Sequence, residues 1–221
     1  MAVEGAGVGV HGSMARSDQQ KLEVRRRILR AALAIISEGG YRDAQVATVA
    51  SAANIATGTV YLYFPSKADL CAEVFRFASS HEIAVLKEIA SLEGSAAERL
   101  ENVVRAFVRR AMRGRRLAYA LLAEPVDPAV EAERISSKQI FAQVFAAIVA
   151  DGMREGLFPE QKVEVAAACI IGALIEALVG PLTPETVGAA AGEELEEQLV
   201  AFCQRAVGWR EPGAVALRSI G

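Results

Sequence analysis

The stretch QVATVASAANIATGTVYLYF, residues 45–64, decides the fold that we predict for this chain. Apolar residues at positions 46, 49, 50 and 53 share one face of a first short helix, roughly Gln45–Ala53. Asn54 follows, one of the few residues besides glycine that tolerates a left-handed backbone, and Gly58–Phe64 forms a second short helix. Two short helices joined by a tight turn and packed on a preceding helix describe a helix-turn-helix.

The residues on either side of this stretch complete a three-helix unit. Upstream, apolar residues between Ile28 and Ile36 recur at helical spacing and predict a helix over 18–38, which a glycine pair ends. Downstream, Ser66 is placed to cap a further helix over 67–91.

The rest of the chain predicts longer and more apolar helices. Glycines and prolines separate these segments, and alternating Val/Ile/Thr-rich runs are scarce, so we expect an all-α protein. The helices are expected near 95–113, 115–123, 128–155, 161–179 and 193–209. The resulting domains are a flexible tail over 1–17, a helix-turn-helix domain over 18–75, a larger helical domain over 76–210 and a tail over 211–221.

Composition excludes several protein classes. Hydrophobic residues make up 52% of the 221 residues, so the chain can bury a sizeable core and is not largely disordered. The nearest approach to a membrane span, Val165–Leu178, is short and carries Glu176, which indicates a buried helix and no membrane association. The first thirteen residues are Gly-rich and lack the features of a secretory signal.

The three cysteines, Cys71, Cys169 and Cys203, are widely spaced and never form a CxxC pair. This spacing predicts neither a disulfide framework nor a metal site, and it suits a reducing cytoplasm. Buried thiols that act as small apolar residues are the expectation, and no cofactor is expected.

Charge is distributed unevenly along the chain. Residues 14–67 hold eight basic and four acidic side chains, whereas residues 68–221 hold 16 basic and 22 acidic ones. A basic head on an acidic body points to an anionic partner such as double-stranded DNA, although a solvated helix face is the simpler alternative.

Residues 45–64 contain no charged side chain, yet they can still read DNA, since Thr, Gln, Tyr and Ala contact base edges and methyl groups while flanking cations hold phosphates. If Val60 and Phe64 face the core, the outward positions are Thr57, Thr59, Leu62 and Tyr63. Lys67 lies at a helix N-terminus, where anions bind favourably. A core role for the aromatic rings remains the alternative for the two tyrosines.

The run Gly58-Thr59-Val60-Tyr61-Leu62-Tyr63-Phe64, followed by Ser66 and Lys67, resembles the TetR family of transcriptional regulators. The resemblance extends over about 24–75 and includes the Gly-Tyr pair at 40–41. It implies a regulator, by family default a repressor, that binds a palindromic operator as a homodimer. It also implies phosphate contacts from Tyr61, Lys67 and the helix start at Thr59. The complete expected DNA-binding set is Gln45, Thr57, Gly58, Thr59, Tyr61, Leu62, Tyr63 and Lys67.

Three positions depart from the family pattern. Ala44 and Gln45 stand where the first motif helix usually begins with Thr or Ser, so its cap must come from elsewhere. Asn54 replaces the usual turn Gly, and Ala56 replaces a Ser that would cap the second motif helix, a role that we assign to Thr57 instead.

The resemblance further implies that the larger domain holds a ligand pocket and a dimer interface. The expected pocket residues are Phe107, Met112, Tyr119, Phe141, Phe145 and Glu176, with Leu122, Ile148, Arg105, Arg109, Arg134 and Gln139 as further candidates. This mostly apolar lining suits a hydrophobic or amphipathic small effector. A buried Glu176 would need a partner, for which a structural ion pair with an arginine is the simpler expectation.

Two apolar stripes are candidates for the dimer interface, although a monomer core could use the same residues. One runs through Ala166, Ile170, Ala173, Leu174 and Ala177, and the other through Leu195, Leu199, Phe202 and Ala206. For induction, the helix over 67–91 is expected to act as the lever between the effector pocket and the DNA-reading head.

An enzyme and a helical scaffold are the competing classes. The two histidines, His11 and His81, lack neighbours at catalytic or metal-ligand spacing, and the chain has no P-loop, GxSxG or HExxH motif. A scaffold would need neither the aromatic run at 58–64 nor the basic head. We therefore expect no catalytic residues.

Overall fold

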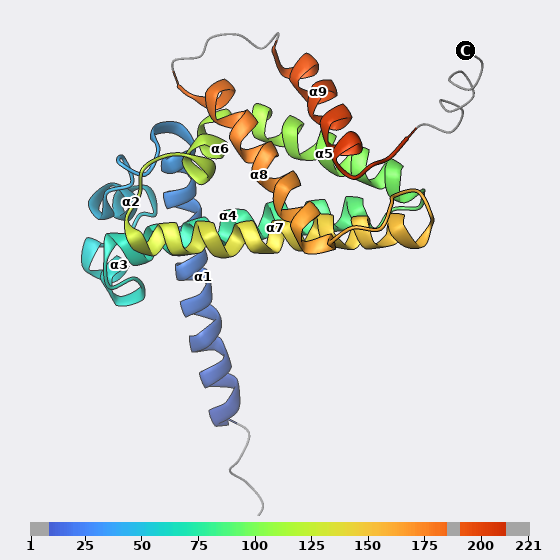
Figure 1. The fold of residues 1–221 in the computed structure, drawn as a ribbon. Helices are drawn as coiled ribbons and strands as arrows, with labels where there is room; N and C mark the ends of the chain where they lie inside the picture. The colour runs from blue at the N-terminus through green and yellow to red at the C-terminus, as the bar shows by residue number, and fades with distance from the viewer. Residues whose placement is uncertain (1–8, 185–190, 211–221) are drawn as a thin grey trace, which may run out of the picture.

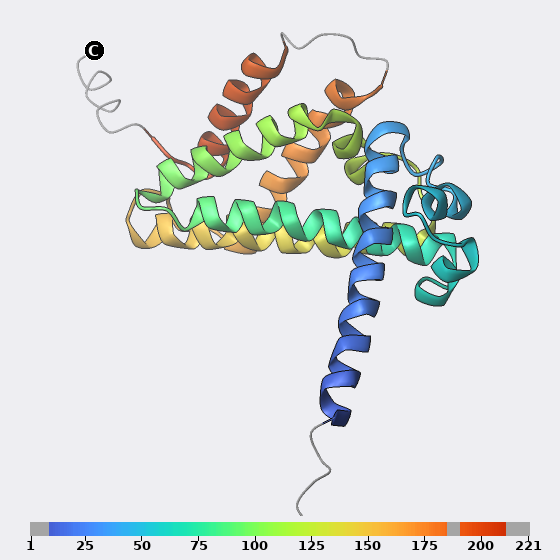
Figure 2. The same cartoon turned by 180° about the vertical axis from the view of Figure 1, so that it is seen from behind.

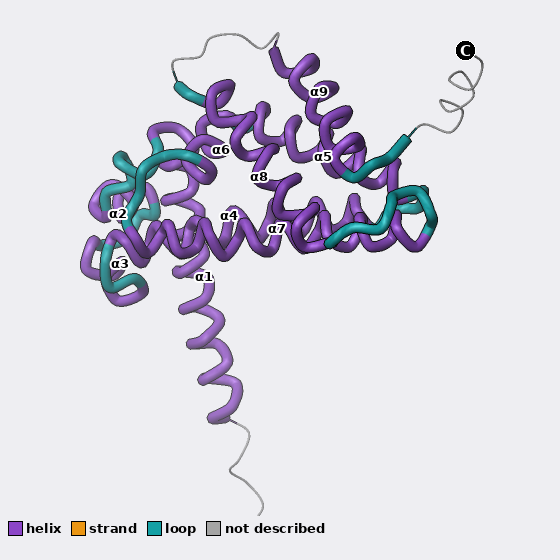
Figure 3. The backbone as a smooth tube through the Cα atoms, viewed as in Figure 1, coloured by secondary structure: helices purple, strands orange, loops and turns teal. Residues whose placement is uncertain are grey.

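The computed structural model describes residues 9–184 and 191–210, and within them helices are the only regular secondary structure, which confirms the all-α prediction (Figures 1 and 3). Of the two expected tails, residues 1–8 and 211–221 lie outside the described residues. The helices are α1 Gly9–Gly39, α2 Val46–Ala52, α3 Thr57–Tyr63, α4 Lys67–Ala90, α5 Ala96–Arg113, α6 Arg115–Leu122, α7 Pro128–Arg154, α8 Val163–Leu182 and α9 Ala191–Ala206.

Helix α1 begins at Gly9, nine residues before the expected start at Asp18. No proline interrupts this segment, and an existing helix extends at little cost because each added residue adds one backbone hydrogen bond. The prediction of a tail over 1–17 is therefore wrong for residues 9–17. Figures 1 and 2 show the first turns of α1 projecting as a rod from the rest of the molecule.

Two hydrophobic clusters divide the structure. The N-terminal cluster joins α1, α2, α3, the first half of α4, α6 through Ala120 and the start of α7 through Val130, with Ile28, Ile36 and Val60 fully buried. The C-terminal cluster joins α5, α7, α8, α9 and the second half of α4, with Leu100 and Phe145 at its centre. The boundary expected at 75/76 thus falls inside α4, where the core contacts of that continuous helix change from one cluster to the other.

Helices α4 and α7 lie side by side over most of their length, and α5, α6, α8 and α9 cover one side of this pair (Figures 1 and 2). Ser66 caps α4 as expected, because its hydroxyl accepts a hydrogen bond from the backbone N–H of Asp69 at 3.1 Å. A capping box between Ser95 and Glu98 begins α5.

Helix α8 is the one helix of the described residues that is long and apolar enough to cross a membrane by length and composition. In this fold it packs against α7 instead, with Ile170, Leu174 and Leu178 buried in the C-terminal cluster. Its opposite face leaves Val165 and Cys169 exposed. The expected buried helix is therefore buried on one face.

Candidate functional site

The turn between α2 and α3 has the conformation that the sequence predicts. Asn54 has a φ of 52°, in the left-handed region, and its N–H donates to the carbonyl of Ser51 at 3.0 Å. The next N–H, that of Ile55, donates to the carbonyl of Ala50 at 3.0 Å. This turn packs α2 and α3 against α1 as a helix-turn-helix.

Helix α3 has one buried face and one exposed face. Val60 and Phe64 are buried in the N-terminal cluster, as expected. Leu62 is 85% exposed and Tyr61 is 49% exposed, so both side chains are available to a partner. Tyr63, which we expected to face outward, is half-buried and packs against the same cluster, so its position lies between the outward-facing role and the core alternative.

The other two expected positions at the start of α3 differ in exposure. Thr57 is exposed, whereas Thr59 is half-buried. Between them, Gly58 faces open space: a Cβ built on it would meet no other atom within 4 Å. The protein itself therefore imposes no need for glycine at position 58.

Neither motif helix has a side-chain cap. Gln45 is the N-cap of α2, and its amide donates to the carbonyl of Arg42 at 2.8 Å instead of accepting from the helix. Ala56 is the N-cap of α3, and Thr57 is the first helical residue, so the expected cap from Thr57 is wrong. At the start of α3 the N–H of Thr59 donates to the carbonyl of Ala56 at 2.9 Å, and no side chain caps the backbone N–H groups before it.

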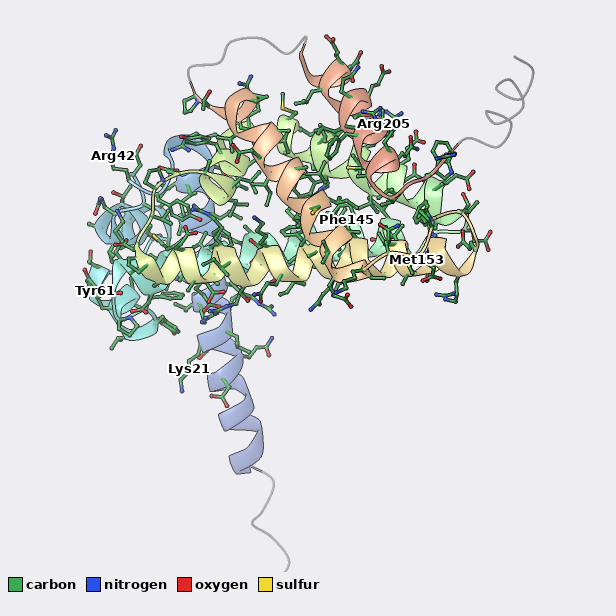
Figure 4. The ribbon with its side chains drawn as sticks, viewed as in Figure 1. Lys21, Arg42, Tyr61, Phe145, Met153 and Arg205 are labelled. Atoms are coloured by element: carbon green, nitrogen blue, oxygen red, sulfur yellow. The ribbon has the colours of Figure 1, made fainter. Side chains whose placement is uncertain are left out.

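Lys67 lies beside this surface at the first position of α4. Its ammonium donates to the carbonyl of Arg42 at 3.3 Å, which holds the charge close to the loop before α2. Arg25 is a structural residue, since it forms an ion pair with Glu73 at 3.0 Å and lies 5.2 Å from the centre of the Phe64 ring. Figure 4 places Tyr61 and Arg42 at the end of the molecule opposite Arg205.

A cavity of about 290 Å³ lies between α4, α5, α6 and α7, with Ile175 of α8 on one wall. Phe107 and Phe141 both line it, as the sequence predicts, and their rings pack edge to face with centroids 5.8 Å apart. Leu122 and Arg134 also line it, which agrees with their place among the further candidates.

Four expected pocket residues do not line this cavity. Phe145 is fully buried in the C-terminal cluster, and Met112 packs against the same cluster. Tyr119 lies under the Arg116 guanidinium, 5.9 Å from it. Glu176 is exposed, so the prediction of a buried carboxylate at this position is wrong.

The buried carboxylate of the larger domain is instead Glu196 on α9. Arg105 and Arg109 bind its two oxygens at 2.8 and 2.7 Å, so these arginines serve the α5–α9 contact and not the cavity. Burial alone would raise the pKa of Glu196, but the hydrogen bonds from Arg109 and Arg105 hold that pKa below its ordinary value.

Sequence reasoning missed the α4 wall of the cavity. Phe75, Ser79, Glu82 and Leu86 all line it. Their spacing of four, three and four residues is that of one helical stripe, and this signal was present in the sequence. Glu82 is held in a two-point ion pair by Arg110 of α5, with distances of 2.6 and 2.9 Å.

Helix α6 connects the cavity to the helix-turn-helix. Leu117 and Leu121 line the cavity, whereas Arg116 donates to the carbonyl of Gly39 at 2.8 Å and pairs with Glu124 at 3.0 Å. The N–H of Tyr41 donates to the same Glu124 carboxylate at 3.4 Å. We refer to this set of contacts between α6 and the end of α1 as the Arg116 clamp.

Arg134 of α7 holds the other end of α6. Its guanidinium donates to the carbonyls of Ala120, Leu121 and Glu124 at 3.3, 2.9 and 2.8 Å. Since Arg134 also lines the cavity, a molecule in the cavity would contact the residues that position α6.

The expected dimer stripes are divided between the core and the surface. Ile170, Leu174 and Leu199 are buried within the chain itself and belong to the C-terminal cluster. Phe202 of α9 is 44% exposed and Val165 of α8 is 57% exposed. Of the predicted stripes, Phe202 therefore stays available to a second copy, whereas Ile170, Leu174 and Leu199 are used by the core of the chain itself.

Comparison with known proteins assigns the chain to a family. A family model described as bacterial regulatory proteins, tetR family, matches residues 28–74. A second, described as the tetracyclin repressor-like C-terminal domain, matches residues 93–207, which is more than half of the chain.

Two curated relatives match over shorter segments. The fatty acid metabolism regulator protein of Bacillus subtilis is 34% identical over 86 residues, which are 39% of this chain and 44% of that protein. The transcriptional repressor KstR of Mycolicibacterium smegmatis is 56% identical over 48 residues, which are 22% of this chain and 24% of KstR. The chain thus matches less than half the length of either relative.

A solved structure extends the likeness to the whole fold. The transcriptional regulator FadR of Bacillus subtilis, in complex with stearoyl-CoA, superposes with a TM-score of 0.68 at 24% identity, over 80% of this chain and 97% of that one. At this identity the superposition shows the fold alone. The matched family models, the helix-turn-helix geometry and the shared fold lead to one conclusion: this chain belongs to the TetR family and is a transcriptional regulator, not an enzyme.

Proposed function

We propose that this protein is a ligand-responsive repressor that binds a palindromic operator as a homodimer and is released by a small hydrophobic or amphipathic molecule. One observation supports this most directly. Phe75 of α4 and Leu117 and Leu121 of α6 line the cavity and also belong to or pack against the N-terminal cluster, so the helix-turn-helix and the cavity share these two helices. The name of KstR, a repressor, supports the sign of regulation.

On the DNA side, we assign phosphate contacts to Tyr61, Lys67 and the start of α3 around Thr59. Leu62 and Thr57, which are exposed, are the side chains for thymine methyls and base edges. The remaining members of the predicted DNA-binding set are Gln45, Gly58 and Tyr63.

Selection of bound fragments from random double-stranded DNA tests this assignment. A palindromic consensus is expected, since two half-sites mirror the two-fold symmetry of a dimer. Lys67→Ala should weaken binding to every sequence similarly and lower the salt slope by about one unit per subunit, or about two for the dimer, since each copy loses one phosphate contact. Lys87→Ala, an exposed lysine at the far end of the same helix, is the control. An unchanged salt slope for Lys67→Ala would remove this lysine from the phosphate contacts.

For the dimer, we assign the interface to the exposed faces of α8 and α9 around Val165, Cys169 and Phe202. A single seven-residue reading helix offers few contacts, so two linked half-sites are needed for tight binding. The exposed apolar side chains on these two helices would gain burial in a dimer.

For the effector, we assign the cavity beside Phe107 and Phe141. The stearoyl-CoA bound by the structural relative supports an apolar ligand in this domain. Four of the five charged residues on the cavity wall pair with each other, Glu82 with Arg110 and Glu131 with Arg134, and the fifth, Lys138, is exposed, which leaves a mostly apolar interior.

Coupling between effector and DNA passes through α6 as well as α4. A ligand that moves Leu117 or Leu121 would shift the Arg116 clamp and thereby the end of α1. Coupling of about 1–3 kcal/mol would change DNA affinity roughly 5–150-fold. Arg116→Ala should keep ligand binding and reduce that ratio toward one in a DNA-release titration with an effector found by screening. If the effector releases DNA from Arg116→Ala as fully as from the wild type, the coupling passes through α4 alone.

A further inference from the structure

The cavity contains two hydroxyl groups that the helices themselves do not use. Ser79 of α4 is 3% exposed and Ser137 of α7 is 7% exposed, and both line the cavity. They lie at the same level of the α4–α7 pair, because Arg76 of α4 pairs with Glu133 of α7 and both helices run in the same direction (Figure 1). Three and four residues further along, these helices bring Ser79 and Ser137 to the cavity.

Neither hydroxyl has a hydrogen-bond partner among the described residues of the protein. Helical serines commonly donate to the carbonyl four residues before them, as Ser37 does to Leu33 at 2.7 Å and Ser91 does to Lys87 at 2.8 Å. Ser79 makes no such bond, and neither does Ser137. Both serines line the cavity, so their hydroxyls are available to hydrogen-bond a polar atom inside it.

The charged side chains of the cavity do not offer a comparable site. Glu82 is held by Arg110, and Arg134 is occupied by three carbonyls and by Glu131. Lys138 is exposed at the rim. The polar atoms available in the interior are therefore neutral.

The size and walls of the cavity limit what can enter it. A volume of about 290 Å³ has room for on the order of ten water-sized groups, at about 30 Å³ each. Phe75, Phe107 and Phe141 contribute three aromatic rings to the walls. This space suits a compact ring system better than a long alkyl chain.

We propose that the cavity binds a compact, neutral, apolar molecule of about ten non-hydrogen atoms whose single hydroxyl or carbonyl oxygen is hydrogen-bonded by Ser79 and Ser137. This inference rests on the proposed ligand-responsive function and specifies the class of its effector. The hydroxyl pair gives orientation, and the three phenylalanines give apolar contact. A plain hydrocarbon of the same size lacks the hydrogen bond to the serines. A carboxylate of the same size brings a charge that the apolar walls do not stabilise.

Calorimetric titration of the full chain, without DNA, tests the proposal with three probes of one shape: naphthalene, 2-naphthol and 2-naphthoate. At pH 7, 2-naphthol should bind roughly 10-fold more tightly than naphthalene, since one or two neutral hydrogen bonds are gained. It should also bind more tightly than 2-naphthoate, whose charge finds no free cation in the interior.

Serine-to-alanine variants inside and outside the cavity test whether the preference for 2-naphthol comes from the two cavity hydroxyls. In the double variant Ser79→Ala, Ser137→Ala the preference for 2-naphthol over naphthalene should fall to about one, with naphthalene affinity retained. Ser80→Ala and Ser136→Ala remove the exposed neighbouring hydroxyls and should keep the preference.

Three outcomes would overturn the proposal: no binding of either neutral probe, equal binding of the two, or a preference that survives in the double variant. Tighter binding of 2-naphthoate would also overturn it, in favour of an anionic effector held at the rim. A separate gel shift on selected DNA reports the proposed repressor function, so failure of the effector class and failure of the regulator are distinguishable.

Discussion

Gly58 offers the sharpest separation between what the protein needs for folding and what it needs for binding. A Cβ at this position would meet no atom within 4 Å, so Gly58→Ala adds a methyl group to the exposed side of α3 without a clash. Alanine is favoured over glycine in a helix by up to about 1 kcal/mol. The free energy of unfolding should therefore rise by a few tenths to about 1 kcal/mol, which corresponds to a Tm increase of roughly 2–4 °C per kcal/mol for a chain of this size.

DNA binding should change in the opposite direction. If α3 lies in the major groove with Gly58 against the DNA, the added methyl group overpacks that contact. Overpacking costs about 1–3 kcal/mol at each site, and two copies on a palindrome would lose on the order of 30-fold in affinity or more. The assays are urea unfolding for stability and fluorescence anisotropy on the selected operator for affinity.

Gly180→Ala is the matched control, because Gly180 is also helical, also faces open space and lies in α8, far from the reading head. It should gain similar stability and keep the affinity for DNA. If Gly58→Ala binds DNA as tightly as the wild type, Gly58 does not lie close to the DNA. If Gly58→Ala is less stable than the wild type, the described geometry of α3 is wrong.

Three further predictions concern other parts of the molecule. Phe202→Glu, at an exposed position of α9, should give folded monomers by light scattering, whereas Leu174→Glu, which buries a charge in the core, should unfold the chain; a dimeric Phe202→Glu would move the interface elsewhere. Ala56→Ser supplies the missing cap of α3 and should raise the unfolding free energy by about 1 kcal/mol in urea titrations; no gain would mean that the uncapped N–H groups already have partners. Burial raises the pKa of Cys203 from 9.0 to about 12, so the native thiol stays protonated where the unfolded thiol ionises. The free energy of unfolding should therefore be unaffected by this group below pH 9 and fall above pH 9 by up to about 1.4 kcal/mol per pH unit. The fall should be less steep in Cys203→Ala. Equal slopes for the wild type and Cys203→Ala from pH 9 to 11 would contradict the assignment.

The helix-turn-helix was predictable because its signals are local. The turn residue Asn54 and the spacing between Val60 and Phe64 depend on neighbours in the chain, and the structure confirms both. The partial burial of Tyr63 was not predictable in the same way, because it depends on how α3 leans against α1 and α4.

The cavity was predictable only in part. Phe107 and Phe141 were found from apolar periodicity, but Phe145 carries the same signal and belongs to the closed core. Periodicity identifies an inward face without saying whether that face meets packed side chains or a cavity. Ser79 was missed for a related reason, since one serine in an apolar stripe looks like an interruption until the surrounding helices are in place.

The assignment of Glu176 failed because α8 is apolar on nearly every face. In such a helix a single charge does not reveal which side is buried, and the contacts with α7 turn Glu176 outward. The exposed apolar positions of the same helix, such as Val165, follow from the same ambiguity.

The Arg116 clamp constrains how this sequence can evolve. Gly40 has a φ of 84°, and a Cβ there would lie 1.5 Å from the Arg116 guanidinium. A side chain at position 40 would therefore displace the Arg116 guanidinium from Gly39 and Glu124, although positions 40 and 116 are far apart in the sequence. In a library randomised at both positions and selected for repression, Gly40 and Arg116 should persist together, and rare replacements of Gly40 by Asn should appear only where position 116 has become small.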